Sequence, residues 1–394
     1  MSQYNDQCLS TNPKTANDYH GAFPYCSVHA QLRPYVADCS AACRRNAPFS
    51  EKDSLQDVVW QIRNISNKLK GTPIQPKICS LLIVSKPGED AVEQKLIEIV
   101  KWLLSHKSFV VYVQHTLKSL FEEHERLQYW TPLLCAKQSQ LFDLVLTLGG
   151  DGTVLYTSRL FQRTVPPIMP FAMGTLGFLT HFDVSKFRES IQSISKEMYI
   201  HLRTRFECRY MRKKDSHKRI ELGDHVFSNS LVENEETHEF VESLVVLNEV
   251  VIDRGPNSAM TKIILYVDSK YLTTVEADGL CLSTPTGSTA YSLATGGSLC
   301  HPEIPVVIIS PICAHSLSLR PIHVPDSMYL HVVIPEDAPH SGWISFDGRN
   351  RTELRPGDFL MVRVSRYPFP SVYSREEQAD WFDSIKRTLM WNQN

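Results

Sequence analysis

A glycine-rich stretch in the first half of the sequence encloses one carboxylate and ends in a hydroxyl group. It follows the apolar run Leu144–Leu148 and comprises Gly149, Gly150, Asp151, Gly152 and Thr153. Glycines at the carboxyl end of a strand let phosphate oxygens approach backbone N–H groups, and the start of a following helix favours anions. We therefore predict a phosphate-binding loop. The alternative is a strand-to-helix turn in which Asp151 only caps the helix.

The loop differs from two other phosphate-binding motifs. The Walker pattern is absent and no lysine lies near the loop, which argues against a P-loop NTPase. Gly150 and Gly152 come close to the dinucleotide fingerprint, but its third glycine is missing and Asp151 would repel a bare pyrophosphate. A carboxylate here suits a metal contact or a base for a hydroxyl group, so we predict that Asp151 is the catalytic residue.

A second stretch, residues 278–297, is rich in hydroxyl side chains. Six of them lie between Ser283 and Ser292, close to Pro285 and Gly287. Hydroxyl groups with close backbone access suit the ribose, phosphate and base edges of a nucleotide. The stretch follows a predicted strand and precedes a helix-forming segment, so we predict a nucleotide-binding loop rather than a structural turn alone.

Strands alternate with helices in the first half, and these elements must position the phosphate loop. Apolar residues recur at helical spacing in Leu55–Lys70, and a short apolar run at Leu81–Val84 precedes a helix from Asp90 to Leu104. A further strand is expected at Phe109–Val113. Because parallel strands need crossovers of this kind, we predict a doubly wound, Rossmann-like α/β domain with a parallel sheet.

The second half contains many short apolar segments and few helices. The expected strands are Leu244–Ile252, Lys262–Val267, Tyr271–Glu276, Val306–Ser310, Met328–Ile334, Trp343–Phe346 and Phe359–Ser365. Strands at such close spacing are typical of a β-sandwich. We therefore predict an all-β, sandwich-like C-terminal domain.

These patterns divide the chain into four parts. Residues 1–50 show little apolar periodicity and are predicted to form a flexible N-terminal arm. The α/β domain is assigned to residues 51–185 and the β-rich domain to residues 186–370, with an inserted loop at 212–240. Residues 371–394 carry apolar side chains at helical intervals, which predicts a C-terminal helix that packs back on the fold.

The composition narrows the class of protein. With 41 basic and 43 acidic residues, the formal net charge is -2, and 42% of the residues are hydrophobic. These values argue against a disordered chain and against a nucleic-acid binder. The longest apolar runs are strand-sized, so we expect no membrane span and no membrane partner.

The N-terminal residues carry neither a secretory signal nor a typical presequence, which predicts a cytoplasmic protein. Four possible metal ligands, Cys26, His29, Cys39 and Cys43, occur in the same region. Their separations fit no standard zinc spacing, so we predict no metal site made by the protein itself.

Three motifs, in this order, resemble those of the NAD kinase family. They are Gly149–Thr153, the Asn248-Glu249 pair and residues 278–297, and the similarity covers about residues 76–370. The segment His315–Pro321 is similar to eukaryotic members, particularly fungal ones. The first motif alone is shared with lipid kinases and with phosphofructokinase-like enzymes, whereas the ordered set is far more specific.

The resemblance implies an activity and its substrates. Members of this family transfer a phosphoryl group from ATP, with Mg²⁺ or another divalent cation, to the 2′-hydroxyl on the adenosine side of NAD, which gives NADP. NADH carries the same ribose, and the sequence leaves open whether it is also an acceptor. The resemblance further implies an ATP-binding α/β domain, an NAD-binding β-rich domain and a homo-oligomer, either a dimer or a tetramer.

The resemblance also assigns roles to single residues. The loop residues Gly149, Gly150, Gly152 and Thr153 would accommodate phosphates, while Asp151 would deprotonate the acceptor hydroxyl or support the metal. Asn248 and Glu249 interrupt an otherwise apolar strand, so their polar groups need partners, and we expect ribose hydroxyls.

Further dinucleotide contacts are implied in the second half of the chain. Asp278 is expected near the nicotinamide end. The pocket lining is expected to comprise Thr286, Ser288, Thr289, Ala290 and Tyr291. Asp347, in the segment Ser345–Arg349, resembles another family position, although an aspartate in a structural β-turn is the alternative.

Two other functions stay open at this point. A lipid kinase of the same superfamily, of the diacylglycerol or sphingosine type, would share the first motif and prefer an apolar substrate groove. A catalytically silent dinucleotide sensor would keep the pocket without turnover, although the presence of Asp151 argues against it.

Overall fold

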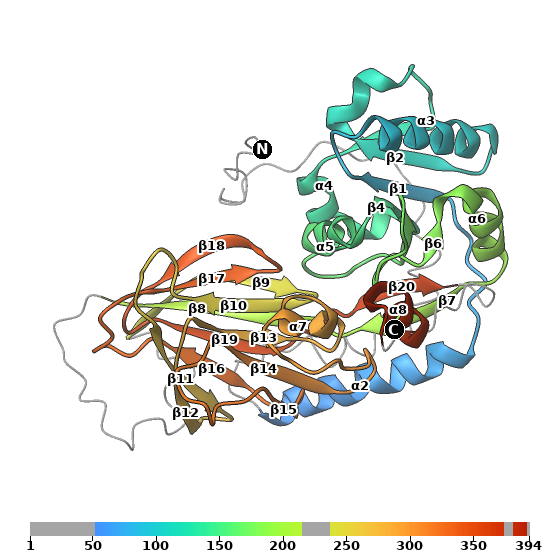
Figure 1. The fold of residues 1–394 in the computed structure, drawn as a ribbon. Coiled ribbons are helices and arrows are strands. Elements are labelled where there is room, and N and C mark those ends of the chain that lie inside the picture. Colours follow the sequence, from blue (N-terminus) through green and yellow to red (C-terminus); the bar gives the residue numbers. More distant parts are fainter. Residues whose placement is uncertain (1–51, 215–236, 374–380, 392–394) are drawn as a thin grey trace.

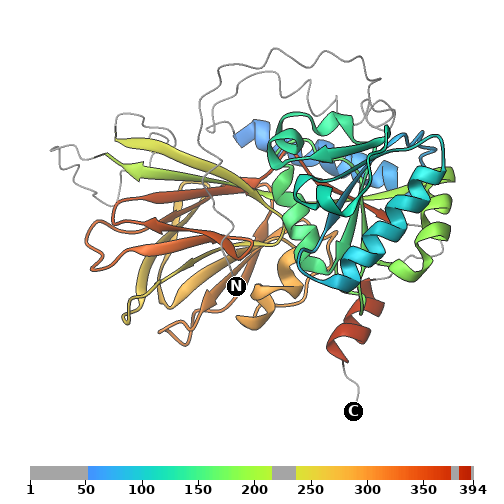
Figure 2. The same ribbon diagram turned by 90° about the horizontal axis from the view of Figure 1, so that it is seen from above.

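The computed structural model describes residues 52–214, 237–373 and 381–391. An α/β domain and a β-rich domain lie next to each other, and the long helix α2, Lys52–Gly71, contacts β7 of the α/β sheet (Figures 1 and 2). The predicted N-terminal arm, the Cys26–Cys43 region and most of the predicted insertion at 212–240 lie outside these residues.

An eight-stranded sheet forms the centre of the α/β domain. Its order is β3-β2-β1-β4-β5-β20-β7, and the short β6 pairs with β5. The strands are β1 Ser80–Ser85, β2 Val110–Gln114, β3 Leu127–Trp130, β4 Leu144–Gly149, β5 Ile168–Ala172, β6 Phe182–Asp183, β7 Tyr199–Arg203 and β20 Phe369–Tyr373. All pairs are parallel except β20 with β7. The prediction of a doubly wound parallel sheet is confirmed.

Helices cover both faces of this sheet. They are α3 Asp90–Ser105, α4 Pro132–Lys137, α5 Asp151–Leu160 and α6 Phe187–Lys196. Successive side chains of a strand point to opposite faces. Leu81 and Ile83 of β1 therefore share a core with α3 and α6, whereas Leu82 and Val84 share a core with α4 and α5. Burial on both sides explains why these strands read as continuous apolar runs.

Two six-stranded antiparallel sheets form the β-rich domain. Their orders are β15-β14-β13-β10-β17-β18 and β12-β11-β16-β19-β8-β9. The strands are β8 Phe206–Lys213, β9 His238–Val246, β10 Glu249–Asp253, β11 Thr261–Val267, β12 Lys270–Ala277, β13 Gly279–Ser283, β14 Val306–Ile312, β15 Ile322–Pro325, β16 Leu330–Val333, β17 Gly342–Phe346, β18 Arg349–Leu354 and β19 Phe359–Val364. Leu282 of one sheet and Leu265 of the other belong to the same apolar core. The sandwich prediction is confirmed.

The chain passes between the domains at two points, and Arg205 forms hydrogen bonds near both. β7 ends at Arg203 in the α/β sheet and β8 begins at Phe206 in the sandwich, while β19 leads back to β20. The buried Arg205 donates to the carbonyl oxygen of Phe161, just after α5, at 2.8 Å and to that of Tyr367, in the return crossing, at 2.7 Å. A cation suits the carboxyl end of a helix, where carbonyl groups lack partners.

Strands from outside the predicted α/β range complete the α/β sheet. β7 and β20 belong to it although they lie beyond residue 185, and β20 follows the whole sandwich in sequence. The limits at residues 185 and 370 stay predictions. After β20 the structure describes the helix α8, Trp381–Leu389, whose Ile385 is buried and whose Trp381 ring lies 5.2 Å from that of His301.

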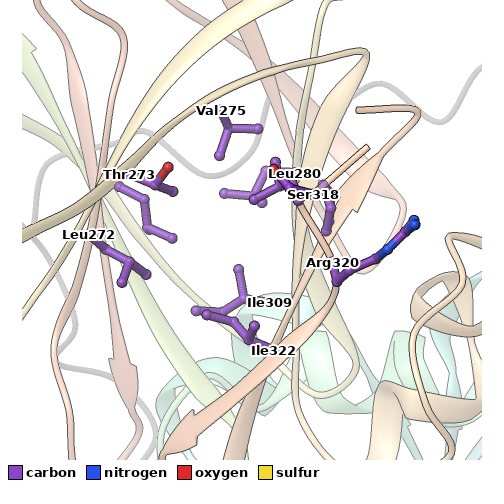
Figure 3. A pocket seen from close by; sticks show the side chains of 11 residues that line it. Leu272, Thr273, Val275, Leu280, Ile309, Ser318, Arg320 and Ile322 are labelled. Atoms are coloured by element: carbon purple, nitrogen blue, oxygen red, sulfur yellow. The ribbon is translucent and has the colours of Figure 1, made fainter. Parts of the chain in front are cut away.

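An apolar cavity of about 230 Å³ lies at one edge of the sandwich (Figure 3). It is lined by Leu265, Leu272, Thr273, Val275, Leu280, Ile309, Pro311, Ser318, Leu319, Arg320 and Ile322. The cavity lies where the edge strand β12 of one sheet faces β14 and β15 of the other. None of the predicted site residues contributes to it.

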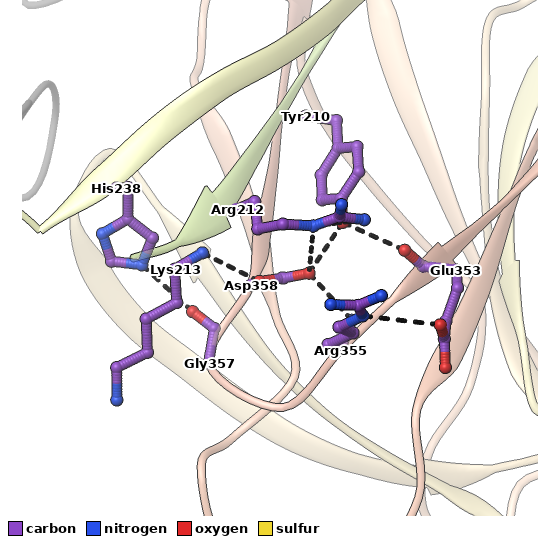
Figure 4. A network of polar contacts seen from close by, with 8 residues as sticks. All are labelled: Tyr210, Arg212, Lys213, His238, Glu353, Arg355, Gly357 and Asp358. Carbon is purple, nitrogen blue, oxygen red and sulfur yellow. Dashed lines mark hydrogen bonds and ion pairs between the residues drawn. The ribbon is translucent and has the colours of Figure 1, made fainter. Parts of the chain in front are cut away.

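A buried polar network secures the turn between β18 and β19 (Figure 4). Asp358 accepts hydrogen bonds from the Tyr210 hydroxyl at 2.7 Å and from the backbone N–H groups of Lys213 and Arg355 at 2.9 Å each. These bonds satisfy a carboxylate that is almost completely buried. We regard the network as structural. In the part of the chain that the structure describes, no helix is long and apolar enough to cross a membrane.

Candidate active site

Asp151 is the first residue of α5, and its carboxylate holds the segment that follows β5. Oδ2 accepts the N–H of Phe178 at 2.9 Å. Oδ1 accepts the N–H of Leu179 at 3.0 Å, the N–H of Thr180 at 3.2 Å and the Thr180 hydroxyl at 3.1 Å. A Cβ atom at Gly177 would lie 2.2 Å from Oδ1, so only glycine permits this approach. These four hydrogen bonds lead to residues 178–180 and none of them to α5, which argues against the alternative that Asp151 only caps its helix.

The glycines around Asp151 leave the backbone open. Gly149 ends β4, Gly150 is the N-cap of α5, and Gly152 and Thr153 lie in its first turn. A Cβ atom at Gly150 or Gly152 would meet nothing within 4 Å. Thr153 is buried, and its N–H bonds to the Gly150 carbonyl at 2.9 Å. The loop therefore offers the close backbone access that a phosphate group needs.

The predicted single strand Leu244–Ile252 is wrong. The chain bends at Leu247 and Asn248, which separates β9 from β10. Asp347 holds the bend, because its partly buried carboxylate accepts the N–H groups of Leu247 at 2.9 Å, Asn248 at 2.8 Å and Glu249 at 3.2 Å. These three N–H groups bond to a side chain instead of a neighbouring strand.

Asp347 itself lies in a tight turn between β17 and β18. Its φ of 47° and the φ of 71° at Gly348 are those of a two-residue hairpin turn. The backbone of Asp347 therefore has the conformation of a β-turn residue, as the alternative interpretation expected. Its carboxylate, however, reaches the Asn248-Glu249 pair, so it shapes that part of the candidate site. Its predicted contact with a dinucleotide stays a prediction.

Asn248 and Glu249 each present a buried side-chain oxygen that has no hydrogen-bond partner. These atoms are Oδ1 of Asn248 and Oε2 of Glu249. Burial and the neighbouring Asp347 raise the pKa of Glu249 to about 8, while the backbone N–H of Tyr291 favours its charged form. Buried polar atoms without partners are uncommon in folded proteins, and a bound ligand with hydroxyl groups would satisfy both.

Glu249→Gln is expected to change the pH dependence of stability. The pKa of Glu249 lies above its ordinary value of 4.5, so its contribution to stability is fully present below pH 4.5 and is lost as pH rises through about 8. Glutamine does not ionise, and the variant should gain stability relative to the wild type by up to about 1.4 kcal/mol per pH unit in this range. Urea unfolding between pH 5 and 9 measures the difference. The control is Glu189→Gln at an exposed position of α6; wild-type and Glu249→Gln curves that stay parallel would refute the effect.

The hydroxyl-rich loop after β13 wraps around the same bend. Thr284 donates its N–H to the Asn248 carbonyl at 2.8 Å and its hydroxyl to the Leu247 carbonyl at 2.6 Å. A Cβ atom at Gly287 would lie 2.4 Å from the Asn248 carbonyl oxygen, so the loop requires glycine there. The two predicted dinucleotide motifs are therefore packed against each other.

The predicted pocket residues of this loop differ in their surroundings. The Ser288 hydroxyl is buried and bonds to the backbone of Cys300, at 2.9 and 3.0 Å. The Thr289 hydroxyl donates to the Thr286 carbonyl at 3.3 Å. Ala290 precedes the short helix α7, Tyr291–Ala294, and the Tyr291 side chain is 44% exposed. Of these residues, Tyr291 is the one that offers an open aromatic surface.

Asp278 lies at the opposite end of β13 from the hydroxyl-rich loop. It precedes Gly279, the first residue of the strand, and its Oδ1 forms an ion pair with the Nε of Arg254 at 3.0 Å. Both side chains are partly exposed. The structure therefore does not bring Asp278 into the cluster around Asn248, and its position near the nicotinamide end stays a prediction.

Arg203 connects the two halves of the site, and the sequence analysis did not identify it. Its guanidinium lies 3.5 Å from the Thr286 hydroxyl and 3.3 Å from the Nε2 of His181, and it interacts electrostatically with Asp151. Burial lowers the pKa of Arg203 to about 10, so it stays charged at neutral pH. A cation at the end of a partly polar strand usually faces solvent, and its burial appears only in the folded structure.

The described residues supply no ready-made metal site. They contain no group of three or more His, Cys, Asp or Glu side chains that could hold an ion. Mg²⁺ usually binds through one or two carboxylates together with substrate phosphates. Asp151, the carboxylate beside the phosphate loop, fits such a shared arrangement better than a site built from protein ligands alone.

Two family models and a curated relative match most of the chain. A family model described as the ATP-NAD kinase N-terminal domain matches residues 81–199, and one described as the ATP-NAD kinase C-terminal domain matches residues 247–374. The ATP-NADH kinase of Saccharomyces cerevisiae is 36% identical over 85% of this chain and 68% of its own length. The chain belongs to the NAD kinase family. The resemblance seen in the sequence is confirmed.

Other NAD kinases and related proteins agree with this assignment. A Schizosaccharomyces pombe protein, named as an uncharacterized kinase, is 70% identical over the full length of both chains. The crystal structure of yeast NADH kinase complexed with NADH is 30% identical, with a TM-score of 0.67 over 81% of this chain and 90% of that one. These matches do not favour a lipid kinase or a silent sensor.

Proposed function

We propose that this NAD kinase transfers the γ-phosphoryl group of ATP to the 2′-hydroxyl of the adenosine ribose of NAD. The observation that carries the proposal is the match of both NAD kinase domains over the described fold. The site geometry supports it, because the open phosphate loop leads into α5, which contacts β9, and the two unpartnered oxygen atoms belong to residues just after β9. NADH has the same reacting ribose, so we include it as an acceptor.

Asp151 would act on the acceptor hydroxyl. Its Oδ1 already accepts three hydrogen bonds, whereas Oδ2 accepts one and keeps room for a further donor. A ribose hydroxyl that donates to Oδ2 would be oriented for attack and could pass its proton to the carboxylate. The four bonds to the protein fix the carboxylate in place, as a positioned base requires.

Mg²⁺ or another divalent cation would arrive with the ATP phosphates. When bound, it neutralises charge that develops on the transferring phosphoryl group. The protein's own part is to present the open backbone of Gly150 and Gly152 to the phosphates and to hold Asp151 beside them. Asp151 would contact the metal as well as the hydroxyl.

Asn248 and Glu249 would bind the ribose hydroxyls. Asn248 Oδ1 can accept a hydroxyl proton, and Glu249 Oε2 can accept or, when protonated, donate one. The Tyr291 ring would contact a base, and Asp278 would lie toward the nicotinamide end. A homo-oligomer, dimer or tetramer, and a cytoplasmic location complete the proposal.

A product assay with several acceptors tests this function. Purified protein is incubated with ATP and Mg²⁺ and with NAD, NADH or a short-chain diacylglycerol, and products are separated by chromatography. We expect NADP from NAD, NADPH from NADH and no phosphorylated lipid. Lipid phosphorylation would support the lipid kinase, and binding of NAD without ATP consumption would support the sensor.

A further inference from the structure

Arg203 is a buried cation without a charged partner. It is 6% exposed, and its Nε has no hydrogen-bond partner. No carboxylate oxygen of the described residues forms an ion pair with it, although Asp151 acts on it through space. Its two contacts, the Thr286 hydroxyl at 3.5 Å and His181 at 3.3 Å, are long for hydrogen bonds.

Two other buried arginines show how the fold normally satisfies such a group. Arg205 directs its nitrogen atoms at backbone carbonyl groups, with distances of 2.7, 2.8 and 3.0 Å to Tyr367, Phe161 and Arg163. Arg363 is paired with the Glu207 carboxylate at 2.9 Å. Arg203 differs from both, since the two residues that it contacts, Thr286 and His181, provide neither a negative charge nor a full set of acceptors.

The neighbouring His181 does not compensate the charge of Arg203. Burial and the positive charges of Arg203 and Arg387 lower the pKa of His181 to about 3, so this histidine is neutral at neutral pH. Because a guanidinium only donates, the His181 Nε2 must accept and its Nδ1 carries the hydrogen. That Nδ1 is also buried without a partner. A buried charge without an ion-pair partner is costly, which indicates that another group completes the site.

The position of Arg203 identifies the chemistry of that group. It lies at the end of β7, at the crossing between the domains, where it contacts Thr286 and interacts electrostatically with Asp151. Asp151 alone would repel a phosphate, and a planar guanidinium beside it would offset this repulsion and bind phosphate oxygens in pairs. We propose that Arg203 binds a phosphate group of the bound nucleotide.

This inference rests on the proposed function for the identity of the nucleotide. The phosphate belongs either to the triphosphate of ATP or to the pyrophosphate of the dinucleotide. Both present the same anionic oxygens to the guanidinium. Inorganic tripolyphosphate imitates the first source and ADP-ribose imitates the second, so the two probes separate them without any need for turnover.

The test compares binding of the two probes by calorimetry in the full-length wild type, Arg203→Met and Arg203→Lys. Loss of a charge-assisted contact should weaken binding of at least one probe by about 10- to 100-fold in the Met variant. The Lys variant keeps the charge but not the fork and should show a smaller loss. Weaker tripolyphosphate binding identifies ATP as the source, and weaker ADP-ribose binding identifies the dinucleotide. Unchanged affinity for both probes in either folded variant overturns the proposal.

Thermal unfolding separates this role from a structural one. Removing an unpaired buried cation should leave the melting temperature of Arg203→Met unchanged or higher. Arg205→Met, by contrast, removes several bonded donors and should melt at a lower temperature, while Arg188→Met on the surface should match the wild type in stability and in affinity for both probes. If Arg203→Met melts as early as Arg205→Met, the arginine is structural and the proposal fails. Absence of NADP formation by the wild type would reject the proposed function but would leave the phosphate-binding result standing.

Discussion

Asp151→Asn should lower kcat for NADP formation by at least about two orders of magnitude while the protein stays folded. The substitution keeps the shape of the side chain and an oxygen that can accept the three bonds now made to Oδ1. It removes the negative charge and the basicity, and general-base catalysis alone typically contributes about 10²–10⁴-fold. Lost support of the metal would add to this decrease. Steady-state kinetics with ATP, Mg²⁺ and NAD measure it.

A second variant separates the effect of the Asp151 charge from the effect of its hydrogen bonds to residues 178–180. Thr180→Val removes the hydroxyl bond to Oδ1, and with it the acceptor of the Gly177 N–H, but leaves the carboxylate intact. It should lower the melting temperature and reduce kcat by less than about tenfold. Near-normal turnover by folded Asp151→Asn protein would remove Asp151 from the mechanism. Equal losses in both variants would reduce its role to holding the segment.

Asp347→Ala should cause the largest loss of stability among these variants. Three N–H groups at the bend would lose their acceptor, and each buried unsatisfied group costs about 1–3 kcal/mol. We therefore expect the free energy of unfolding to fall by at least about 3 kcal/mol, measured with urea. Because the bend carries Asn248 and Glu249, any folded protein should also have a higher KM for NAD than the wild type, with a smaller change for ATP.

Two further variants control for the turn and for a general loss of charge. Asparagine tolerates a left-handed backbone and keeps one acceptor oxygen, so Asp347→Asn removes the charge and one of the two acceptors without the strain that alanine would meet at a φ of 47°. Asp337→Ala removes an exposed carboxylate paired with Lys262 and should change stability by less than about 1 kcal/mol. Wild-type stability and KM in Asp347→Ala would show that the bend does not depend on this carboxylate.

Much of the fold was predictable from the sequence because its strands have strong local signals. The apolar run at Leu144–Leu148 and the following glycines specify a buried strand and a turn, and β4 and α5 occupy these positions. The return of β20 to the α/β sheet was not predictable. It depends on pairing with β5 and β7, which are far away in sequence, and local propensity carries no information about such contacts.

The motifs of the site could be predicted from the sequence, but the hydrogen bonds that join their residues could not. Asn248 and Glu249 were identified as polar residues in an apolar run, but their separation from β9 results from a carboxylate about one hundred residues later, Asp347. Arg203 was missed because surface and buried arginines look alike in a sequence. The partners that the hydroxyl groups of Ser288 and Thr284 find within the protein likewise appear only after folding.

The position of the new phosphate in the product tests the proposed reaction most directly. Wild-type protein is incubated with ATP, Mg²⁺ and NAD, and the product is analysed by ³¹P NMR, with the 2′-deoxy analogue of NAD in a parallel reaction. We predict a phosphomonoester on the 2′-oxygen of the adenosine ribose and no phosphorylation of the deoxy analogue. A product phosphorylated elsewhere, turnover of the deoxy analogue, or no phosphorylated dinucleotide at all would contradict the proposed reaction.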